Sequence, residues 1–338
     1  MNICLRALTA PIVMLLFLLP PAPGVAQDDS AGALDDSAGG DPKPPPPPKA
    51  PPVPGSSENF MIAAANPLAA EAGYQILKAG GSAVDAAITT QLVLTLVEPQ
   101  SSGIGGGAFM LHYNKAEKSL TAYDGRETAP AAVHSNLFFK PGGEMMNFNE
   151  AAVGGRAVGV PGVLRMLELA HQKHGNMRWS ELFDPAIKMA EKGFPVSQRL
   201  HDLLLQDQEL RKQSDAQAYF YPKDGVPVQV GEILQNFELS ETYRLIASEG
   251  ADAFYKGEIA DAIVTLVQGH ENTGFISQKD MANYQAKTRE PVCRAYRRYR
   301  LCGMPPPTSG GLTTLQIMAI LERFDLSELE PGSPEAVH

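Results

Sequence analysis

The sequence predicts an α+β fold that is rich in helices. Two kinds of pattern indicate it: helical segments cover much of the chain after residue 66, and two pairs of short strand-like segments lie at 108–124 and 291–304. Residues 58–338 are available for globular structure, which is enough for a full hydrophobic core. The 57 residues before them lack the pattern of a folded domain.

The first 57 residues are predicted to lie outside the folded region. Residues 1–26 have the plan of a signal peptide, with a basic residue, an apolar stretch over 7–19 and small residues before Gln27. Residues 27–57 are rich in Pro, Gly, Ala and Asp, which is typical of a disordered, partly polyproline II tether. We expect a periplasmic or secreted protein with no membrane association after signal cleavage. The alternative for residues 1–26 is a membrane anchor.

The charge balance argues against a nucleic-acid partner. Lys and Arg number 28 against 38 Asp and Glu, so the net charge of −10 offers no general basic surface for phosphate contacts. Three cysteines are too few for a disulfide scaffold or a cysteine-rich zinc module. Any bound anion must therefore be held by a local group.

Two helices are predicted to open the folded region. An Asn-Pro start and a Gly-Gly stop bracket a helix over 67–79. Ser82 and Asp85 resemble a capping box at the start of a second helix over 83–97. This second helix is apolar almost all round, so we expect it to be buried.

A glycine-rich turn at 103–107 leads into a predicted hairpin with strands over 108–113 and 120–124. The turn lacks the Gly-Lys-Ser/Thr of a P-loop, and no strand precedes it as a dinucleotide fingerprint requires. Nucleotide binding is therefore disfavoured. We expect these glycines to let the loop pass close to packed backbone.

From residue 162 onward the patterns are mostly helical. His171 and His174 have a spacing that could hold a metal ion, but no third ligand is evident nearby. A solvated helix end, where the helix dipole favours histidine, is the preferred interpretation. The predicted helices span 163–174, 181–192, 197–212, 240–248, 258–269 and 278–284.

The segment 291–304 predicts a second hairpin. If Arg297 and Arg298 form a two-residue turn, Cys293 lies opposite Cys302 at a non-hydrogen-bonded pair, where the Cα separation suits a disulfide. Export favours the oxidised pair, although a reduced pair packed in the sheet is the alternative. The basic and aromatic residues of this hairpin are interpreted as a solvated face, because the chain as a whole is acidic.

Six short blocks of sequence carry a more specific signal. They are NPLAA at 66–70, GGSAVDAA at 80–87, EPQSSGIGGG at 98–107, DGRETAP at 124–130, AVGVPG at 157–162 and MPPPTSGG at 304–311. In content and order these blocks closely resemble the γ-glutamyltransferase (glutathione hydrolase) family, and the match runs from about residue 60 to the last residue.

The resemblance implies an N-terminal nucleophile hydrolase with a four-layer αββα sandwich, present here in incomplete form. Members of this family are precursors that cut themselves, and the new N-terminal Thr of the small subunit becomes the nucleophile, with its own α-amine as general base. The Thr attacks a γ-glutamyl amide, usually that of glutathione, and the acyl-enzyme passes the glutamyl group to water or an amino acid. No metal or other cofactor is expected.

Arg126 is the position that matches a substrate-binding residue of the family. An arginine just beyond a strand end presents a planar fork that can hold an α-carboxylate through two hydrogen bonds, which suits a glutamyl group in an acidic protein. The alternative is a surface arginine paired with Asp124 or Glu127. With the resemblance in view we expect substrate binding.

The family's Thr-Thr-His-like block was not found in this sequence, so no catalytic residue is assigned. Thr313-Thr314 is followed by Leu315 and is interpreted as the start of a helix. Ser333-Pro334 opens a helix that has few residues to follow it. We therefore expect residues 58–338 to be a large-subunit region truncated at its C-terminus, inactive without a partner small subunit that carries the nucleophile.

Two other functions stay open at this stage. The chain could be a noncatalytic module that binds γ-glutamyl compounds or a partner protein. It could also act on a different substrate, since relatives of this architecture include cephalosporin acylases and a poly-γ-glutamate transpeptidase. The sequence does not rank hydrolysis against transfer, nor does it name the acceptor.

Overall fold

The computed structural model describes residues 56–338. The predicted signal peptide, and the predicted tether up to residue 55, lie outside the described residues. The helices are α1 (Pro67–Lys78), α2 (Ala83–Val97), α3 (Phe148–Ala152), α4 (Val163–His174), α5 (Asp184–Lys192), α6 (Gln198–Gln206), α7 (Ser214–Phe220), α8 (Phe237–Glu249), α9 (Asp252–Tyr255), α10 (Glu258–Gly269), α11 (Gln278–Asn283), α12 (Gly310–Leu321) and α13 (Pro334–Val337). The strands are β1 (Ala108–Asn114), β2 (Ser119–Gly125), β3 (Phe194–Pro195), β4 (Ile233–Leu234), β5 (Lys287–Arg289), β6 (Val292–Tyr296) and β7 (Tyr299–Gly303).

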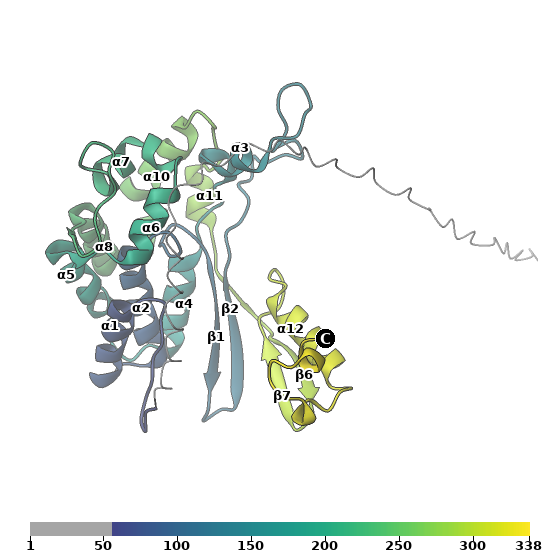
Figure 1. Ribbon diagram of the computed structural model, residues 1–338. Helices are drawn as coiled ribbons and strands as arrows, with labels where there is room; N and C mark the ends of the chain where they lie inside the picture. Colours follow the sequence, from purple (N-terminus) through teal and green to yellow (C-terminus); the bar gives the residue numbers. More distant parts are fainter. Residues whose placement is uncertain (1–55) are drawn as a thin grey trace, which may run out of the picture. The chain divides into compact units, whose positions relative to one another are not determined.

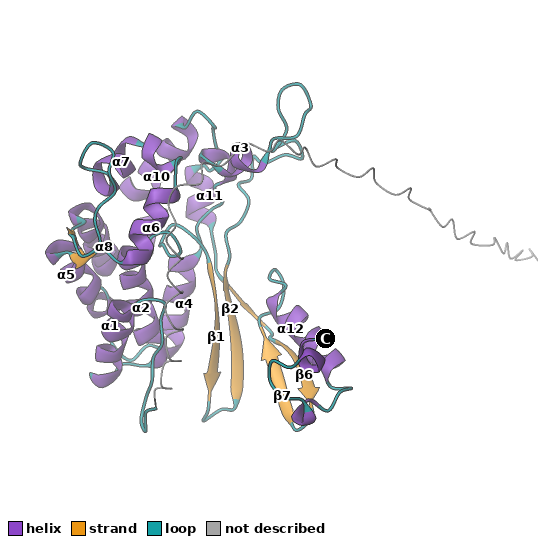
Figure 2. Ribbon diagram, viewed as in Figure 1, coloured by secondary structure: helices purple, strands orange, loops and turns teal. Residues whose placement is uncertain are grey.

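The predicted mixture of helix and sheet, with helices in the majority, is confirmed (Figure 2). Both opening helices begin at the expected caps. The Asn66 side chain accepts a hydrogen bond from the backbone of Leu68, and Ser82 and Asp85 form a reciprocal capping box. As predicted, α2 is buried on most sides, because it packs against α1, α4 and α5.

The main sheet has three antiparallel strands in the order β1, β2, β5, and Figure 1 shows β1 and β2 side by side. The hairpin register pairs Ala108 with Gly125, and Ala122 of β2 pairs with Arg289 of β5. Helix α4 packs on this sheet, so the predicted hairpin is confirmed and has a helical cover. The β1 side chains Leu111 and Tyr113 are 42% and 59% exposed.

The helix predicted over 181–192 is interrupted in the structure, so that prediction was wrong at its start. A 3₁₀ turn spans Trp179–Leu182, and the α-helix begins at Asp184. Pro185 is the cause, because proline fits the first turn of a helix but would remove a hydrogen bond from the interior of a longer one.

The helix predicted over 197–212 was too long. Helix α6 ends at Gln206, and the side chain of Asp207 then accepts hydrogen bonds from the backbone of Glu209 and Leu210. A short polar side chain that bonds the backbone ahead of it competes with helix continuation. A separate 3₁₀ turn follows over Leu210–Lys212.

The later helical predictions are confirmed within a few residues at their ends. Helices α8, α10 and α11 cover the segments expected at 240–248, 258–269 and 278–284. The short helices α3, α7 and α9 carry no strong sequence pattern and were not predicted.

The C-terminal hairpin has the predicted register. Cys293 lies opposite Cys302 with a Cα separation of 4.1 Å, and their sulfur atoms are bonded. Arg297 adopts the left-handed conformation (φ 49°) that a tight turn requires, although glycine or asparagine would fit it better. Helix α12 packs on both strands and begins at Gly310, three residues before the predicted start.

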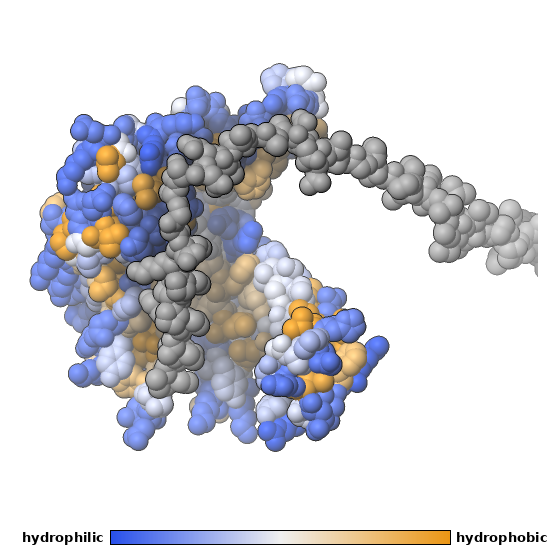
Figure 3. All heavy atoms as spheres, viewed as in Figure 1, coloured by the Kyte–Doolittle hydropathy of each residue, from blue (hydrophilic) through white to orange (hydrophobic). Residues whose placement is uncertain are grey.

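Polar residues cover most of the helical part on the face drawn in Figure 3, with apolar groups scattered among them. Within residues 56–338, no helix combines the length and the apolar character needed to cross a bilayer.

Candidate functional site

Arg126 directly follows β2 and presents its side chain to solvent. The side chain is 59% exposed, and its Nε lies 3.5 Å from Oε2 of Glu127. This is the ion pair considered as the alternative role of Arg126, and it uses one edge of the guanidinium. The two terminal nitrogens form the other fork, which can still receive a carboxylate.

The backbone of Arg126 is held on both sides. Its N–H donates to Oδ1 of Asp124 at 2.9 Å, and its carbonyl accepts from the hydroxyl of Tyr284 at 2.7 Å. The other carboxylate oxygen of Asp124 accepts from Nε of Arg289 at 2.6 Å. Asp124 therefore does not pair with the Arg126 side chain but fixes its main chain instead.

Glycines allow three backbone segments to meet beside Arg126. A Cβ on Gly125 would lie 2.9 Å from the carbonyl oxygen of Gly162, and a Cβ on Gly162 would lie 2.3 Å from that of Gly125. A Cβ on Gly107 would lie 2.7 Å from the backbone carbonyl oxygen of Gly125 and 2.5 Å from the Glu127 carboxylate. A larger residue at any of these three glycines would force the neighbouring backbone to move. The expected close passage of the glycine-rich loop to packed backbone is therefore confirmed at Gly107.

Hydrogen bonds join the same three segments. The carbonyl of Gly106 accepts from the backbone N–H groups of Gly162 and Val163 at 2.9 and 3.1 Å. Thr128 and Val160 exchange two backbone hydrogen bonds of 3.3 and 2.8 Å. Three of the six sequence blocks, those at 98–107, 124–130 and 157–162, therefore converge on one place.

Tyr284 is well suited to remain a hydrogen-bond donor. Its residue is 7% exposed, and burial, together with the nearby charges of Asp124 and Glu127, raises its pKa to about 12. The hydroxyl stays protonated throughout the physiological pH range. It can therefore donate to the Arg126 carbonyl over that whole range.

The interpretation of His171 and His174 as a solvated helix end was wrong, because the first hairpin and the loop after α4 pack over them. The His174 ring stacks on His112 of β1 at 3.9 Å, and its Nε2 lies 2.7 Å from the Tyr123 hydroxyl. Nε2 of His171 lies 2.9 Å from the carbonyl oxygen of Met177. In the described part of the chain, no group of three or more His, Cys, Asp or Glu residues is arranged to hold a metal ion.

The stacked histidines predict an acid-sensitive contact between α4 and the sheet. Burial lowers the pKa of His112, and the adjacent His174 lowers it further, whereas Glu117 raises it. Another cation, Lys173, lies over the ring of the neighbouring Tyr123. Below the unfolded-state value near 6.5, the unfolded chain takes up a proton that the folded chain resists. Stability is therefore fully present above pH 6.5 and falls as the pH drops toward the lowered pKa.

Urea unfolding at pH 7.5 and 5.5 tests this contact. The loss of unfolding free energy between the two pH values is expected to be smaller in His112→Gln than in the unsubstituted chain. His338→Gln, which changes an exposed histidine, is the control and should keep the full loss. Equal losses in all three proteins would contradict the assignment.

The comparisons with known proteins fit this arrangement. The family model described as gamma-glutamyltranspeptidase matches residues 69–338. This chain belongs to the gamma-glutamyltranspeptidase family. The glutathione hydrolase proenzyme of Bacillus subtilis (strain 168) is 41% identical over 275 residues, which are 81% of this chain and 46% of that protein. The acylase ACY 1 proenzyme of Pseudomonas sp. (strain SE83) is 35% identical over 84% of this chain and 51% of its own length.

Solved structures of the family share the fold. Helicobacter pylori gamma-glutamyltranspeptidase superposes with a TM-score of 0.80 at 34% identity, covering 85% of this chain and 81% of that one. The gamma-glutamyltranspeptidase from Pseudomonas nitroreducens complexed with L-DON gives 0.76 at 34% identity, over 84% of this chain and 82% of the other. The expected N-terminal nucleophile hydrolase fold class is thereby confirmed. The chain spans about half the length of the curated gamma-glutamyltranspeptidase relatives it matches.

Sequence reasoning found Arg126 but missed the groups that hold it. Tyr284 and Arg289 lie 158 and 165 residues from their partners Arg126 and Asp124. A tyrosine after a short helix and an arginine in a short strand give no local sign of such contacts. From the sequence, Asp124 is expected only as a partner of the Arg126 side chain.

Proposed function

We propose that this chain binds the γ-glutamyl group of glutathione and of other γ-glutamyl compounds, and that Arg126 holds its α-carboxylate. The observation that carries the proposal is the exposed guanidinium of Arg126 on a backbone fixed at both its N–H and its carbonyl, in a member of the gamma-glutamyltranspeptidase family. A fixed, planar, charged fork suits recognition of a carboxylate.

The reaction proposed for the complete protein is transfer of the γ-glutamyl group to water or an amino acid. The nucleophilic Thr, whose α-amine acts as general base, would come from a partner segment outside residues 1–338. Two facts support this division. Thr313 and Thr314 lie inside α12, and the chain spans about half of its curated relatives, several of which are named proenzymes. On this proposal the 338-residue chain binds a γ-glutamyl substrate but does not convert it to product.

We further propose that the protein acts after export to the periplasm or medium. Residues 1–26 have the plan of a signal peptide, and the bonded Cys293 and Cys302 suit an oxidising compartment.

An acylase-like activity is the second candidate, because a relative named as an acylase proenzyme is 35% identical to this chain. The two candidates differ in the group presented to Arg126. A γ-glutamyl substrate offers a free α-carboxylate beside an α-amine, whereas a bulky acyl chain offers no such pair. Arg126 therefore favours the glutamyl substrate.

Calorimetric titration of the 338-residue chain with two isomers tests the proposed binding. L-Glutamine keeps the α-carboxylate and carries a γ-amide, while L-isoglutamine has an α-amide and a free γ-carboxylate. We expect saturable binding of L-glutamine that is at least about tenfold tighter than that of L-isoglutamine, since the α-carboxylate that Arg126 would pair with is a neutral amide in the latter. Equal binding of the two isomers, or no binding of either, would refute the proposal.

A further inference from the structure

Two buried tyrosines connect the Arg126 segment to the segment before α4. The rings of Tyr255 and Tyr284 stack with centroids 5.9 Å apart and an interplanar angle of 11°. Each hydroxyl donates to a backbone carbonyl, Tyr255 to Pro161 at 2.9 Å and Tyr284 to Arg126 at 2.7 Å. These carbonyls belong to the residues next to Gly162 and Gly125, the two glycines in backbone contact.

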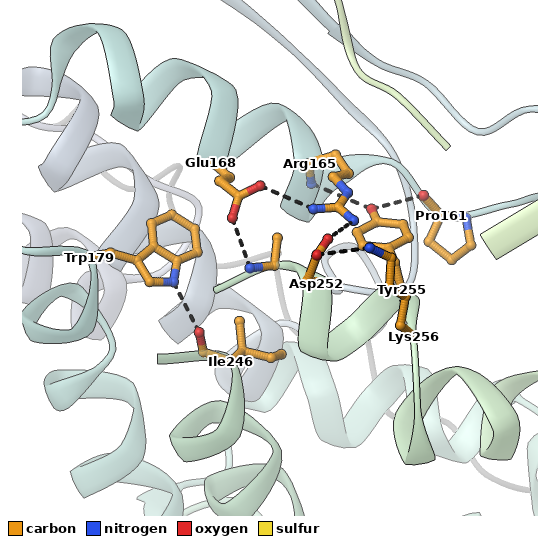
Figure 4. Close-up of polar contacts among 9 residues, drawn as sticks. Pro161, Arg165, Glu168, Trp179, Ile246, Asp252, Tyr255 and Lys256 are labelled. Carbon is orange, nitrogen blue, oxygen red and sulfur yellow. Dashed lines mark hydrogen bonds and ion pairs between the residues drawn. The ribbon is translucent and has the colours of Figure 1, made fainter. Parts of the chain in front are cut away.

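Tyr255 is itself held from several sides (Figure 4). Its residue is fully buried, and the guanidinium carbon of Arg165 lies 4.5 Å from its ring centroid. Arg165 in turn pairs with Asp252 of α9 and, at 3.2 Å, with Glu168 of α4. The stacked rings therefore connect two well-fixed helices to the carbonyl of Arg126.

The hydrogen bond from Tyr284 fixes the carbonyl of Arg126, which the hydrogen bond to Asp124 leaves free to rotate. Asp124 fixes the N–H side of Arg126, but the peptide between Arg126 and Glu127 could still rotate if its carbonyl had no partner. Rotation there would move Glu127, whose Oε2 lies 3.5 Å from Nε of Arg126, and so would change where the guanidinium is held. Small displacements of a binding group have large effects on affinity. A partly buried carbonyl without its partner would also favour such a rotation.

We infer that Tyr284, supported by Tyr255, is a positioning residue that sets the affinity of Arg126 for the α-carboxylate of a γ-glutamyl ligand. This inference rests on the binding role proposed for Arg126. Tyr284 does not touch the ligand in this scheme. It acts through the backbone of Arg126 alone.

The test compares two buried tyrosines in the 338-residue chain. Tyr284→Phe removes the bond to Arg126. Tyr243→Phe removes a bond of the same kind, from the Tyr243 hydroxyl to the carbonyl of Leu92 at 2.9 Å. Both variants lose one buried hydroxyl donor, so both are expected to lose similar thermal stability.

Only Tyr284→Phe is expected to weaken binding of L-glutamine, by about tenfold, and to reduce its preference over L-isoglutamine. Tyr243→Phe should stay within about twofold of the unsubstituted chain. Hydrogen exchange is a second readout, because the backbone over 126–128 should exchange faster in Tyr284→Phe and not in Tyr243→Phe. If Tyr284→Phe does not fold, Tyr255→Phe replaces it, with the same direction of change expected.

The outcomes separate this inference from the proposed function. If Arg126→Lys weakens binding while Tyr284→Phe does not, the positioning role is overturned and the function of Arg126 stands. Equal weakening by Tyr284→Phe and Tyr243→Phe would also overturn it, since the effect would then be one of general stability. If Arg126→Lys leaves affinity unchanged, the proposed function fails and the positioning role fails with it.

Discussion

Replacing Arg126 by lysine is expected to weaken L-glutamine binding by tenfold to a hundredfold. Lysine keeps the positive charge and the attraction to Glu127, but it loses the planar fork that forms two parallel hydrogen bonds with a carboxylate. A charge-assisted hydrogen bond contributes about 1.5–3 kcal/mol, and each 1.4 kcal/mol corresponds to about a factor of ten in affinity. Calorimetric titration of the 338-residue chain measures the change.

Arg178→Lys is the matched control for this substitution. Arg178 is also an exposed arginine, 81% accessible, and pairs with Glu181 at 2.6 Å. The control should bind L-glutamine as the unsubstituted chain does, because Arg178 directly precedes the 3₁₀ turn before α5 and does not lie at the end of β2. An Arg126→Lys variant that binds equally well would remove Arg126 from the site.

Gly162→Ala is expected to cause the largest loss of stability, about 3 kcal/mol. The new Cβ would lie 2.1 Å from the Tyr284 hydroxyl oxygen and 2.3 Å from the carbonyl oxygen of Gly125, so one of the two must move. Either movement separates the segments that meet beside Arg126. Thermal unfolding should show a decrease of roughly 5–10 °C, given the usual relation of free energy to Tm for a domain of this size.

Gly105→Ala provides the comparison within the glycine-rich loop. A Cβ at Gly105 would meet no atom within 4 Å among the described residues. The change should therefore alter the free energy of unfolding by no more than about 0.5 kcal/mol. Similar melting temperatures for both alanine variants would show that the close contact at Gly162 is not important for stability.

Local signals accounted for the elements that sequence reasoning placed well. The caps at Asn66 and Ser82 act within one helical turn, and the register of the second hairpin follows from its two-residue turn at Arg297. The two helix predictions that were wrong at one end gave too little weight to a single residue. Pro185 starts a helix rather than lying within one, and Asp207 ends one by bonding the backbone ahead of it.

The support of the candidate site could not be predicted in this way. The sequence identified Arg126 through its motif, but Tyr284 and Arg289 reach it only once the chain has folded. His174 shows the same limit. Its place near a helix C-terminus indicated a solvated helix end, whereas the β1–β2 hairpin covers it in the structure.

The long separation between Arg126 and Tyr284 has a consequence for the order in which the protein assembles. A nascent chain that has emerged only through α10 already contains β1, β2 and α4, but neither Tyr284 nor Arg289. Contacts between residues so far apart in the chain form late, because closing the intervening loop is costly in entropy. Binding competence would then appear only in chains that have folded through β5. A γ-glutamyl compound present during folding would bind only such chains and shift the equilibrium toward them.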